Sequence, residues 1–103
     1  MRIVQALTTL SFGDAVGNDT IAIMELLRKN GYADTAIYAE NLDARMATID
    51  GVHKVEEMTG LKPDDIIIYH LSTGSNLNRK IKDYDCRKLV IYHNVTPANF
   101  YEK

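Results

Sequence analysis

The chain has 103 residues, of which 46% are apolar and 25% are charged, and its formal net charge is −2. This length favours one domain, and the composition argues against a disordered or collagen-like chain. The 12 basic and 14 acidic residues are interspersed, so a protein that binds nucleic acid through a broad basic face is not expected.

Cysteine content and hydropathy indicate the compartment. Cys86 is the single cysteine, so it cannot form an internal disulfide and leaves no cysteine-based zinc cluster. We expect it to be a structural thiol, because nothing around it in the sequence suggests a lowered pKa. The amino terminus has no signal-peptide pattern, and no apolar stretch approaches the roughly 20 residues that cross a bilayer. These features predict a cytoplasmic protein without a transmembrane segment.

The first third of the chain predicts a strand followed by a helix. The apolar, partly β-branched run Ile3–Leu10 has the length of a buried strand. A glycine-bearing turn follows over residues 11–19. Apolar residues at helical spacing from Ile21 onward then predict a helix that ends at Gly31, since glycine commonly follows the last helical residue.

The middle of the chain carries weaker patterns. The short apolar run Thr35–Ala39 predicts a second strand. We expect a short helix over residues 43–49 and one helical turn at 55–58. A loop is predicted at 62–65, because Pro63 fixes its φ angle and removes a backbone donor.

The last third contains the strongest strand pattern. Ile66–His70 opens with three isoleucines, and such a run predicts a strand buried on both faces. Asp64 and Asp65 precede this strand, and we interpret them as solvated loop residues. An amphipathic helix is predicted over Asn76–Tyr84, and a further buried strand over Leu89–His93. Strands that alternate with helices are typical of the α/β class with a parallel sheet and right-handed crossovers.

In such a sheet, ligands bind beyond the carboxyl ends of the strands. Gly13 and Gly17 flank the start of the first predicted helix, where missing side chains would let a ligand approach and the N–H groups of the first turn favour an anion. Their spacing matches neither the dinucleotide fingerprint nor the Walker A loop. The alternative is a tight turn in which Asn18 or Asp19 caps the helix.

Two histidines close apolar strands in the same tripeptide, Ile-Tyr-His. His70 and His93 would both lie at the ligand-binding edge, where imidazole can donate, accept or carry charge. A single such histidine is usually packed or solvated, but two at one edge are candidates for function. Zinc would need further ligands, and none is offered at suitable spacing.

Three segments, at 12–19, 68–75 and 90–97, together resemble the N-terminal part of family 4 glycosyltransferases of the GT-B fold. The first is similar to the bacterial group in which Gly-Asp-Ala, a hydrophobic residue and Gly-Asn-Asp follow the first strand. The resemblance spans almost the whole chain in the right order. It implies a Rossmann-like three-layer domain with a parallel sheet of about four to five strands.

The same resemblance implies that residues 1–103 are a single, partial N-terminal domain. The C-terminal donor-binding domain would be absent, and the sheet truncated. Enzymes of this family move a sugar from a nucleotide-sugar to an acceptor with retention of configuration, and they need no metal and no cofactor. The N-terminal domain mainly receives the acceptor, so we expect the isolated fragment to be inactive. Neither the donor nor the acceptor can be specified further.

Site residues follow from the resemblance position by position. The donor-phosphate loop would comprise Gly13, Asp14, Gly17 and Asn18. His93 would be the catalytic residue, in contact with the donor sugar near the reacting centre. The cleft would be lined by His70, Ser72, Thr73, Gly74 and Asn94.

Other interpretations have different requirements. A small flavodoxin-like module that binds a phosphate-containing ligand or a protein partner remains the main alternative. A response regulator would need acidic residues at strand ends that here carry Thr and His, and a nicotinamide half-domain would need a different glycine spacing. A sheet cut after its last strand would also expose an apolar edge, so we expect self-association or segment exchange there.

Overall fold

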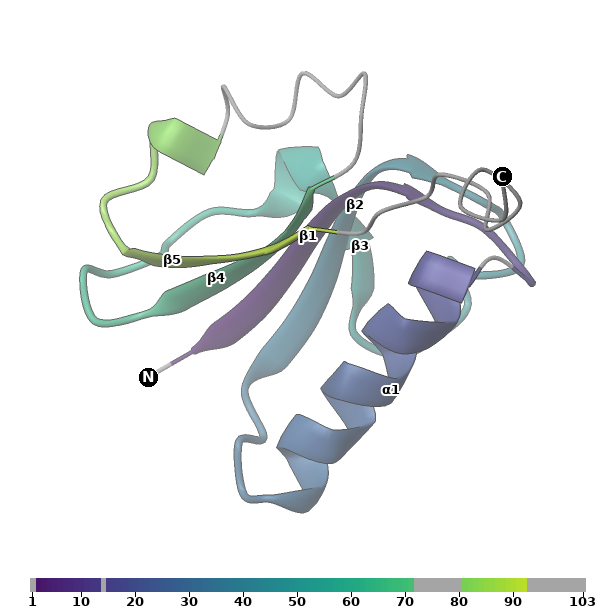
Figure 1. Cartoon of the computed structure of the whole chain (residues 1–103), viewed down its shortest axis with the longest axis horizontal. Coiled ribbons are helices and arrows are strands. Elements are labelled where there is room, and N and C mark those ends of the chain that lie inside the picture. Colours follow the sequence, from purple (N-terminus) through teal and green to yellow (C-terminus); the bar gives the residue numbers. More distant parts are fainter. Residues whose placement is uncertain (1, 14, 72–80, 93–103) are drawn as a thin grey trace, which may run out of the picture.

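The computed structural model describes residues 2–13, 15–71 and 81–92 (Figure 1). The elements in chain order are β1 (Ile3–Leu10), α1 (Ala15–Lys29), β2 (Thr35–Leu42), β3 (Val52–Lys54), the 3-10 helix η1 (Val55–Glu57), β4 (Ile66–Leu71) and β5 (Arg87–Tyr92). The predicted α/β class is confirmed. No helix in the described ranges is long and apolar enough to cross a membrane.

All five strands form one parallel sheet in the order β3-β2-β1-β4-β5 (Figure 1). β1 lies in the middle, with Ile3 opposite Thr35 of β2 on one side and opposite Ile66 of β4 on the other. After β3 the chain crosses to the opposite side of β1, so the strand order reverses between β1 and β4. This arrangement is Rossmann-like, and the reversal creates a topological switch point.

A buried core lies on each face of the sheet. α1 packs on one face, where the core comprises Leu7, Leu10, Met24, Ile37, Ala39, Met46 and Val52. η1 and Ile81 pack on the other, where the core comprises Val4, Ala6, Ala36, Tyr38, Val55, Met58, Ile67, Tyr69 and Ile81. This two-sided burial explains the nearly continuous apolar run in β1.

The end of α1 follows the sequence prediction closely. The helix stops at Lys29, and Gly31 adopts a φ of 94°, a left-handed conformation that glycine reaches without strain. The amide of Tyr32 donates to the carbonyl of Leu27 at 2.9 Å, and the Asn30 side chain donates to the carbonyl of Leu26 at 2.7 Å. These bonds satisfy carbonyl groups that the last turn would otherwise leave unpaired.

Two predictions for the middle of the chain were wrong or incomplete. Residues 43–49 form turns instead of a helix, because the Asp43 carboxylate accepts the backbone N–H groups of Phe12 and Arg45 and holds the chain in a turn. β3 was missed, since a three-residue strand is too short to show a hydrophobic period. Of the predicted helix over 76–84, residues 76–80 lie outside the described ranges, and residues 81 and 82 are helical.

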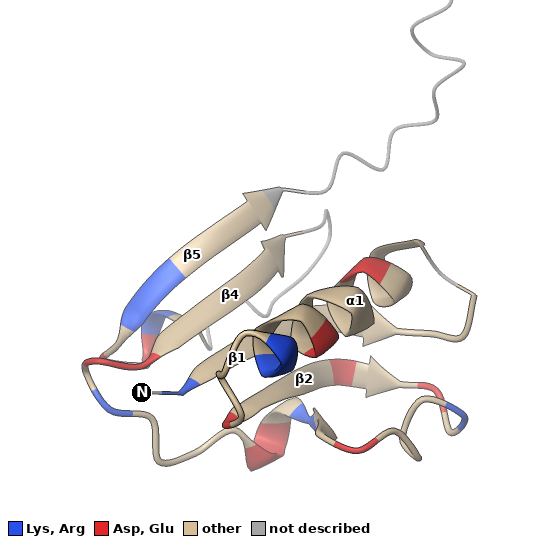
Figure 2. Cartoon of the chain, turned by 90° about the horizontal axis from the view of Figure 1, so that it is seen from below, with Lys and Arg blue, Asp and Glu red and all other residues tan. Residues whose placement is uncertain are grey.

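β5 is apolar but exposed, whereas the sequence predicted a buried strand. Leu89 is 56% exposed and Val90 is 59% exposed. β5 is the last strand of the sheet, and Figure 2 shows α1 lying across β1 and β2, away from it. Within the described ranges no strand pairs with its outer edge.

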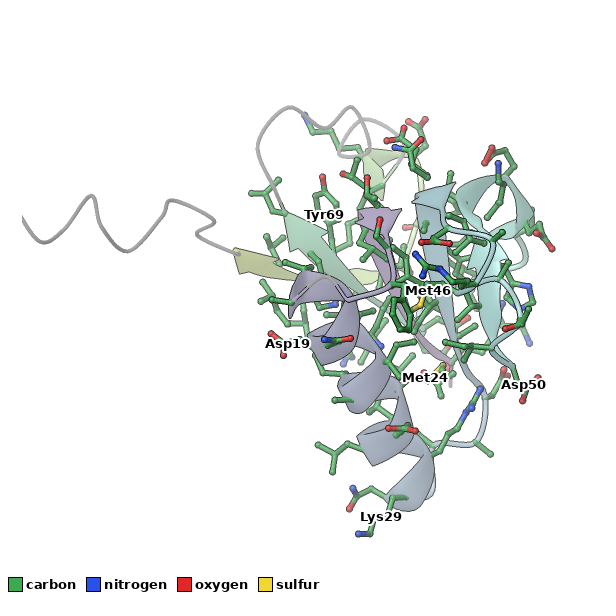
Figure 3. All side chains as sticks on the ribbon, turned by 90° about the vertical axis from the view of Figure 1, so that its right-hand side faces the viewer. Asp19, Met24, Lys29, Met46, Asp50 and Tyr69 are labelled. Atoms are coloured by element: carbon green, nitrogen blue, oxygen red, sulfur yellow. The ribbon has the colours of Figure 1, made fainter. Side chains whose placement is uncertain are left out.

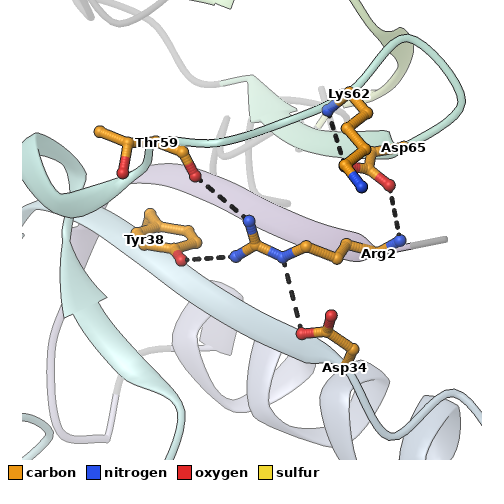
Figure 4. A network of polar contacts seen from close by, with 6 residues as sticks. All are labelled: Arg2, Asp34, Tyr38, Thr59, Lys62 and Asp65. Carbon is orange, nitrogen blue, oxygen red and sulfur yellow. Dashed lines mark hydrogen bonds and ion pairs between the residues drawn. The ribbon is translucent and has the colours of Figure 1, made fainter.

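A polar network closes the amino edge of the sheet (Figure 4). The Arg2 backbone N–H donates to Asp65 Oδ1 at 2.8 Å, and its guanidinium donates to the carbonyl of Thr59 and the hydroxyl of Tyr38. Asp65 Oδ2 accepts the N–H of Lys62 at 2.8 Å. Asp65 is only 2% exposed, so the prediction of a solvated residue was wrong for it. The sequence could not show that the loop containing Asp65 lies beside the start of β1.

Hydrogen bonds from the backbone of Arg2 and then of Lys62 lower the pKa of Asp65 from the ordinary 3.8. The folded chain therefore holds the charged form more strongly than the unfolded chain does. The resulting stabilisation is fully present above about pH 4 and is lost as the pH falls through the lowered pKa.

We expect Asp65→Asn to lower the free energy of unfolding at pH 7 and to flatten its decline in acid, as measured by urea unfolding at a series of pH values. Asp64→Asn, at the exposed neighbour, should change neither; equal curves for both variants would contradict the assignment.

Candidate functional site

The switch point lies where the carboxyl ends of β1 and β4 separate. β1 pairs with β2 as far as Leu10 opposite Leu42, but with β4 only as far as Leu7 opposite His70. The end of β1 therefore extends past its pairing with β4. β4 and β5 end level with each other, with Leu71 opposite Tyr92. In open parallel sheets, ligands bind in the crevice at this place.

The loop after β1 turns sharply at Gly13. This residue has a φ of 80°, and a Cβ placed on it would meet nothing within 4 Å. Its conformation, and not its surroundings, therefore requires glycine. Asn18 is exposed one turn into α1, while the predicted Asp14 lies outside the described residues.

Gly17 is buried against the end of β1. A Cβ on it would lie 3.1 Å from the carbonyl oxygen of Ser11 and 3.2 Å from Leu10 Cδ1. The missing side chain thus allows α1 to approach the strand closely. The sequence predicted that the missing side chain of Gly17 leaves space for a ligand phosphate. In the structure that space is filled by the end of β1.

His70 is 1% exposed and forms part of a buried polar chain. Its Nε2 lies 2.8 Å from Oε1 of Gln5, which is fully buried in β1. The Gln5 Nε2 donates to the backbone carbonyl of Thr20 in α1 at 2.9 Å. His70, which the sequence predicted to line the cleft, is therefore hydrogen-bonded to β1 directly and linked to α1 through Gln5. Sequence reasoning missed Gln5, although a polar residue inside an apolar strand was a signal for such a partner.

Thr8 follows the last residue of β1 that pairs with β4. Its Oγ1 is buried, and among the described residues it has no hydrogen-bond partner. A buried hydroxyl without a partner costs about 1–3 kcal/mol, so a water or a ligand group at this position would be stabilised. Thr35, at the start of β2, carries a second hydroxyl of this kind.

A groove of about 480 Å³ lies between α1 and the segment after β2, lined by Phe12, Asn18, Ile21, Ala22, Glu25, Arg45, Met46 and Ile49. Figure 3 shows Met46 on the α1 side of the sheet, as Met24 is. The Arg45 guanidinium carbon lies 4.5 Å above the centre of the Phe12 ring, a cation–π contact. Asn18 belongs to this groove and not to the buried surface that Gly17 forms with β1.

Asp43 fastens the loop after β2 to the loop after β1. Its carboxylate accepts the N–H of Arg45 at 2.9 Å and the N–H of Phe12 at 3.3 Å. The bond from the Arg45 backbone is the largest cause that lowers the pKa of Asp43, followed by the Arg45 side chain and the Phe12 amide. A carboxylate that stays charged keeps the two loops together, and with them one wall of the groove.

Other candidate chemistry is weaker. Burial raises the pKa of the half-buried Cys86 thiol, which makes it a poor nucleophile, as the sequence suggested. Within the described ranges, no three His, Cys, Asp or Glu side chains are grouped so as to hold a metal ion. The predicted residues Ser72, Thr73, Gly74, His93 and Asn94 lie outside those ranges. Of the predicted site residues, the structure describes Gly13, Gly17 and Asn18 after β1 and His70 in the neighbouring strand β4.

Comparison with protein-family models, with curated proteins and with solved structures gives no match for this chain. The fold and the geometry of the switch point are thus the observations from which its function can be inferred.

The packing of Gly17 has a measurable consequence. We expect Gly17→Val to lower the free energy of unfolding by about 1–3 kcal/mol, because the added methyl groups must displace the end of β1. Urea unfolding followed by circular dichroism measures this loss. Ala22→Val, at an exposed position of the same helix, introduces the same side chain without the contact and should cost less. Equal losses in the two variants would show that the close approach of α1 to β1 is unimportant.

Proposed function

We propose that this chain is the N-terminal, acceptor-side part of a retaining glycosyltransferase that moves a sugar from a nucleotide-sugar to an acceptor. One observation carries the proposal. The segment at 12–19 begins just after β1, and those at 68–75 and 90–97 begin within β4 and β5, which follow one another on one side of β1 in the sheet. Since parallel strands end at one edge, the described parts of the three segments that resemble the family lie toward the same edge of the sheet.

The chemistry of such a transfer suits this crevice. A departing nucleoside diphosphate gathers negative charge, and backbone N–H groups at the start of α1 favour an anion there. His93 would contact the donor sugar near the reacting centre by orienting a hydroxyl, and we do not assign it the role of a general base. The unpartnered Thr8 hydroxyl supports a polar ligand beside β1. The proposal requires neither a metal nor a cofactor, and it places the protein in the cytoplasm.

Titration of the ¹⁵N-labelled 103-residue chain with UDP-glucose, GDP-mannose and UDP tests the proposal. We expect amide shifts at Gly13, Gly17 and Asn18 and at the end of β4, because these residues follow β1 or close β4, where we propose that the ligand binds, even where binding is only millimolar. Amides of the Arg2–Asp65 network at the opposite edge serve as an internal control and should not move. Saturating amide shifts confined to the Arg2–Asp65 network, or equal amide shifts with glucose alone, would contradict a site for sugar-nucleotides at the carboxyl ends of the strands.

A second candidate function is favoured by the exposed strand β5. A small α/β module that binds a protein partner or a phosphate-containing ligand would use such a surface. A mostly apolar groove of about 250 Å³ borders it, lined by Tyr69, Leu71, Ile81, Lys82, Lys88 and Val90. Exposed edge strands readily pair with another chain. Reading the gene past codon 103 separates the candidates, since a following second domain favours the transferase and a stop codon favours the module.

Self-association through β5 is expected from the same surface. Sedimentation velocity at rising concentration should show the unmodified chain forming dimers or larger species, and Val90→Lys should reduce this by placing a charge on the edge. Leu26→Lys is the matched control, because Leu26 on α1 is 59% exposed, as Val90 is. A chain that stays monomeric at every concentration, or equal effects of the two variants, would exclude pairing through β5.

A further inference from the structure

Gln5 is the one polar residue among the buried residues Ile3–Leu7 of β1, and it is 0% exposed. It lies on the face of the sheet that α1 covers, between the helix and the side chain of His70. Buried amide and imidazole groups are tolerated only when their donors and acceptors are matched. The matching in this chain has a single solution.

The hydrogen bonds fix the direction of each group. The backbone carbonyl of Thr20 can only accept, so the atom of the Gln5 amide that faces it at 2.9 Å must be the nitrogen. The amide oxygen therefore faces Nε2 of His70 at 2.8 Å. Because this oxygen can only accept, Nε2 of His70 must carry a proton. Turning the amide round would place two acceptors against each other at Thr20.

We propose that Gln5 is a positioning residue that holds His70 with its proton on Nε2 at the switch point. When the ring is neutral, its lone pair then lies on Nδ1, and any group of the chain or of a ligand that meets Nδ1 must donate. A ligand group that reaches this nitrogen is thus a donor such as a sugar hydroxyl, whereas a phosphate oxygen would be repelled. The part of this inference that concerns a ligand rests on the proposed function, but the state of the ring does not.

The same chain of bonds explains why the position is polar. His70 belongs to β4, Gln5 to β1 and Thr20 to α1, so two hydrogen bonds join the three elements that meet at the switch point. An apolar residue at position 5 would fill the space, but it would leave a buried N–H of His70 without its acceptor. We infer that the amide sets the orientation of the imidazole, because the register alone fixes only the backbone of His70 opposite Leu7.

Long-range ¹H–¹⁵N correlation spectra of the ¹⁵N-labelled 103-residue chain report which ring nitrogen carries the proton. The chain has 3 histidines, and a background of His53→Gln and His93→Gln leaves His70 alone in the spectrum. We expect a single Nε2–H tautomer. In Gln5→Leu the buried Nε2–H loses its acceptor, and the ratio of tautomers should shift roughly five-fold or more toward Nδ1–H.

Two variants separate hydrogen bonding from packing. Gln5→Glu keeps an acceptor toward His70, and its protonated oxygen can donate to the Thr20 carbonyl in place of the amide nitrogen, so Nε2 should stay protonated. Thr20→Val removes a hydroxyl but keeps the carbonyl that binds Gln5, so it should leave the His70 spectrum unchanged. A merely structural role of Gln5 predicts no difference between the leucine and glutamate variants.

An Nδ1–H form or a rapidly averaging mixture in the unmodified ring would overturn the proposal, as would a Gln5→Leu spectrum identical to that of the unmodified chain. If Gln5→Leu fails to fold, the unmodified chain and Gln5→Glu still decide the question. The spectra are recorded without any nucleotide-sugar, so a failure of the tautomer assignment is distinct from a failure of sugar-nucleotide binding.

Discussion

The central position of β1 is the constraint on which the rest of the structure depends. Strands pair with both of its edges, and side chains cover both of its faces, so that Val4, Ala6 and Leu10 are completely buried. A buried strand needs partners for its backbone N–H and C=O groups, and here β2 pairs with β1 as far as Leu10 and β4 as far as Leu7, both in parallel. Because β2 and β4 lie on opposite sides of β1, the chain must cross over the sheet between them. That crossing produces the switch point.

Polar groups near β1 have different roles at its two ends. At the amino end, Asp65 accepts backbone N–H groups of Arg2 and Lys62 and joins the start of β1 to the loop before β4. Toward the carboxyl end, Gln5 and His70 join β1 to α1 and β4 within the core. The first network joins the start of β1 to a loop, while the second includes an imidazole near the switch point, which is why we propose a positioning role for Gln5 in the second.

The two glycines of the loop after β1 illustrate how similar residues serve different physical needs. Gly13 is required by a left-handed backbone angle in open space, whereas Gly17 is required by contact with Ser11 and Leu10. Close packing of α1 on the end of β1 explains why position 17 is glycine, and no ligand is needed for that explanation. The proposed anion site therefore rests on the backbone of the loop and on the start of α1, and not on the space that Gly17 leaves.

Much of the fold was predictable from local patterns. The bounds of β1, the end of α1 shortly before Gly31 and the parallel character of the sheet follow from apolar run length and turn residues. The position of the switch point at the carboxyl ends of the strands was also predictable, because parallel strands end at one edge of the sheet. Such features are readable because hydrophobic period and backbone preference depend on neighbours in the sequence.

By itself, then, the sequence determined where the longer strands and α1 lie and which polar residues follow those strands, although it did not show β3. Only the tertiary structure decided that β5 is exposed, that Asp65 is buried, that Gly17 faces β1, and that Gln5 is the partner of His70. Each of these depends on contacts between residues far apart in the chain. Burial and hydrogen-bond partners are set by which elements pack together, and no local pattern contains that information.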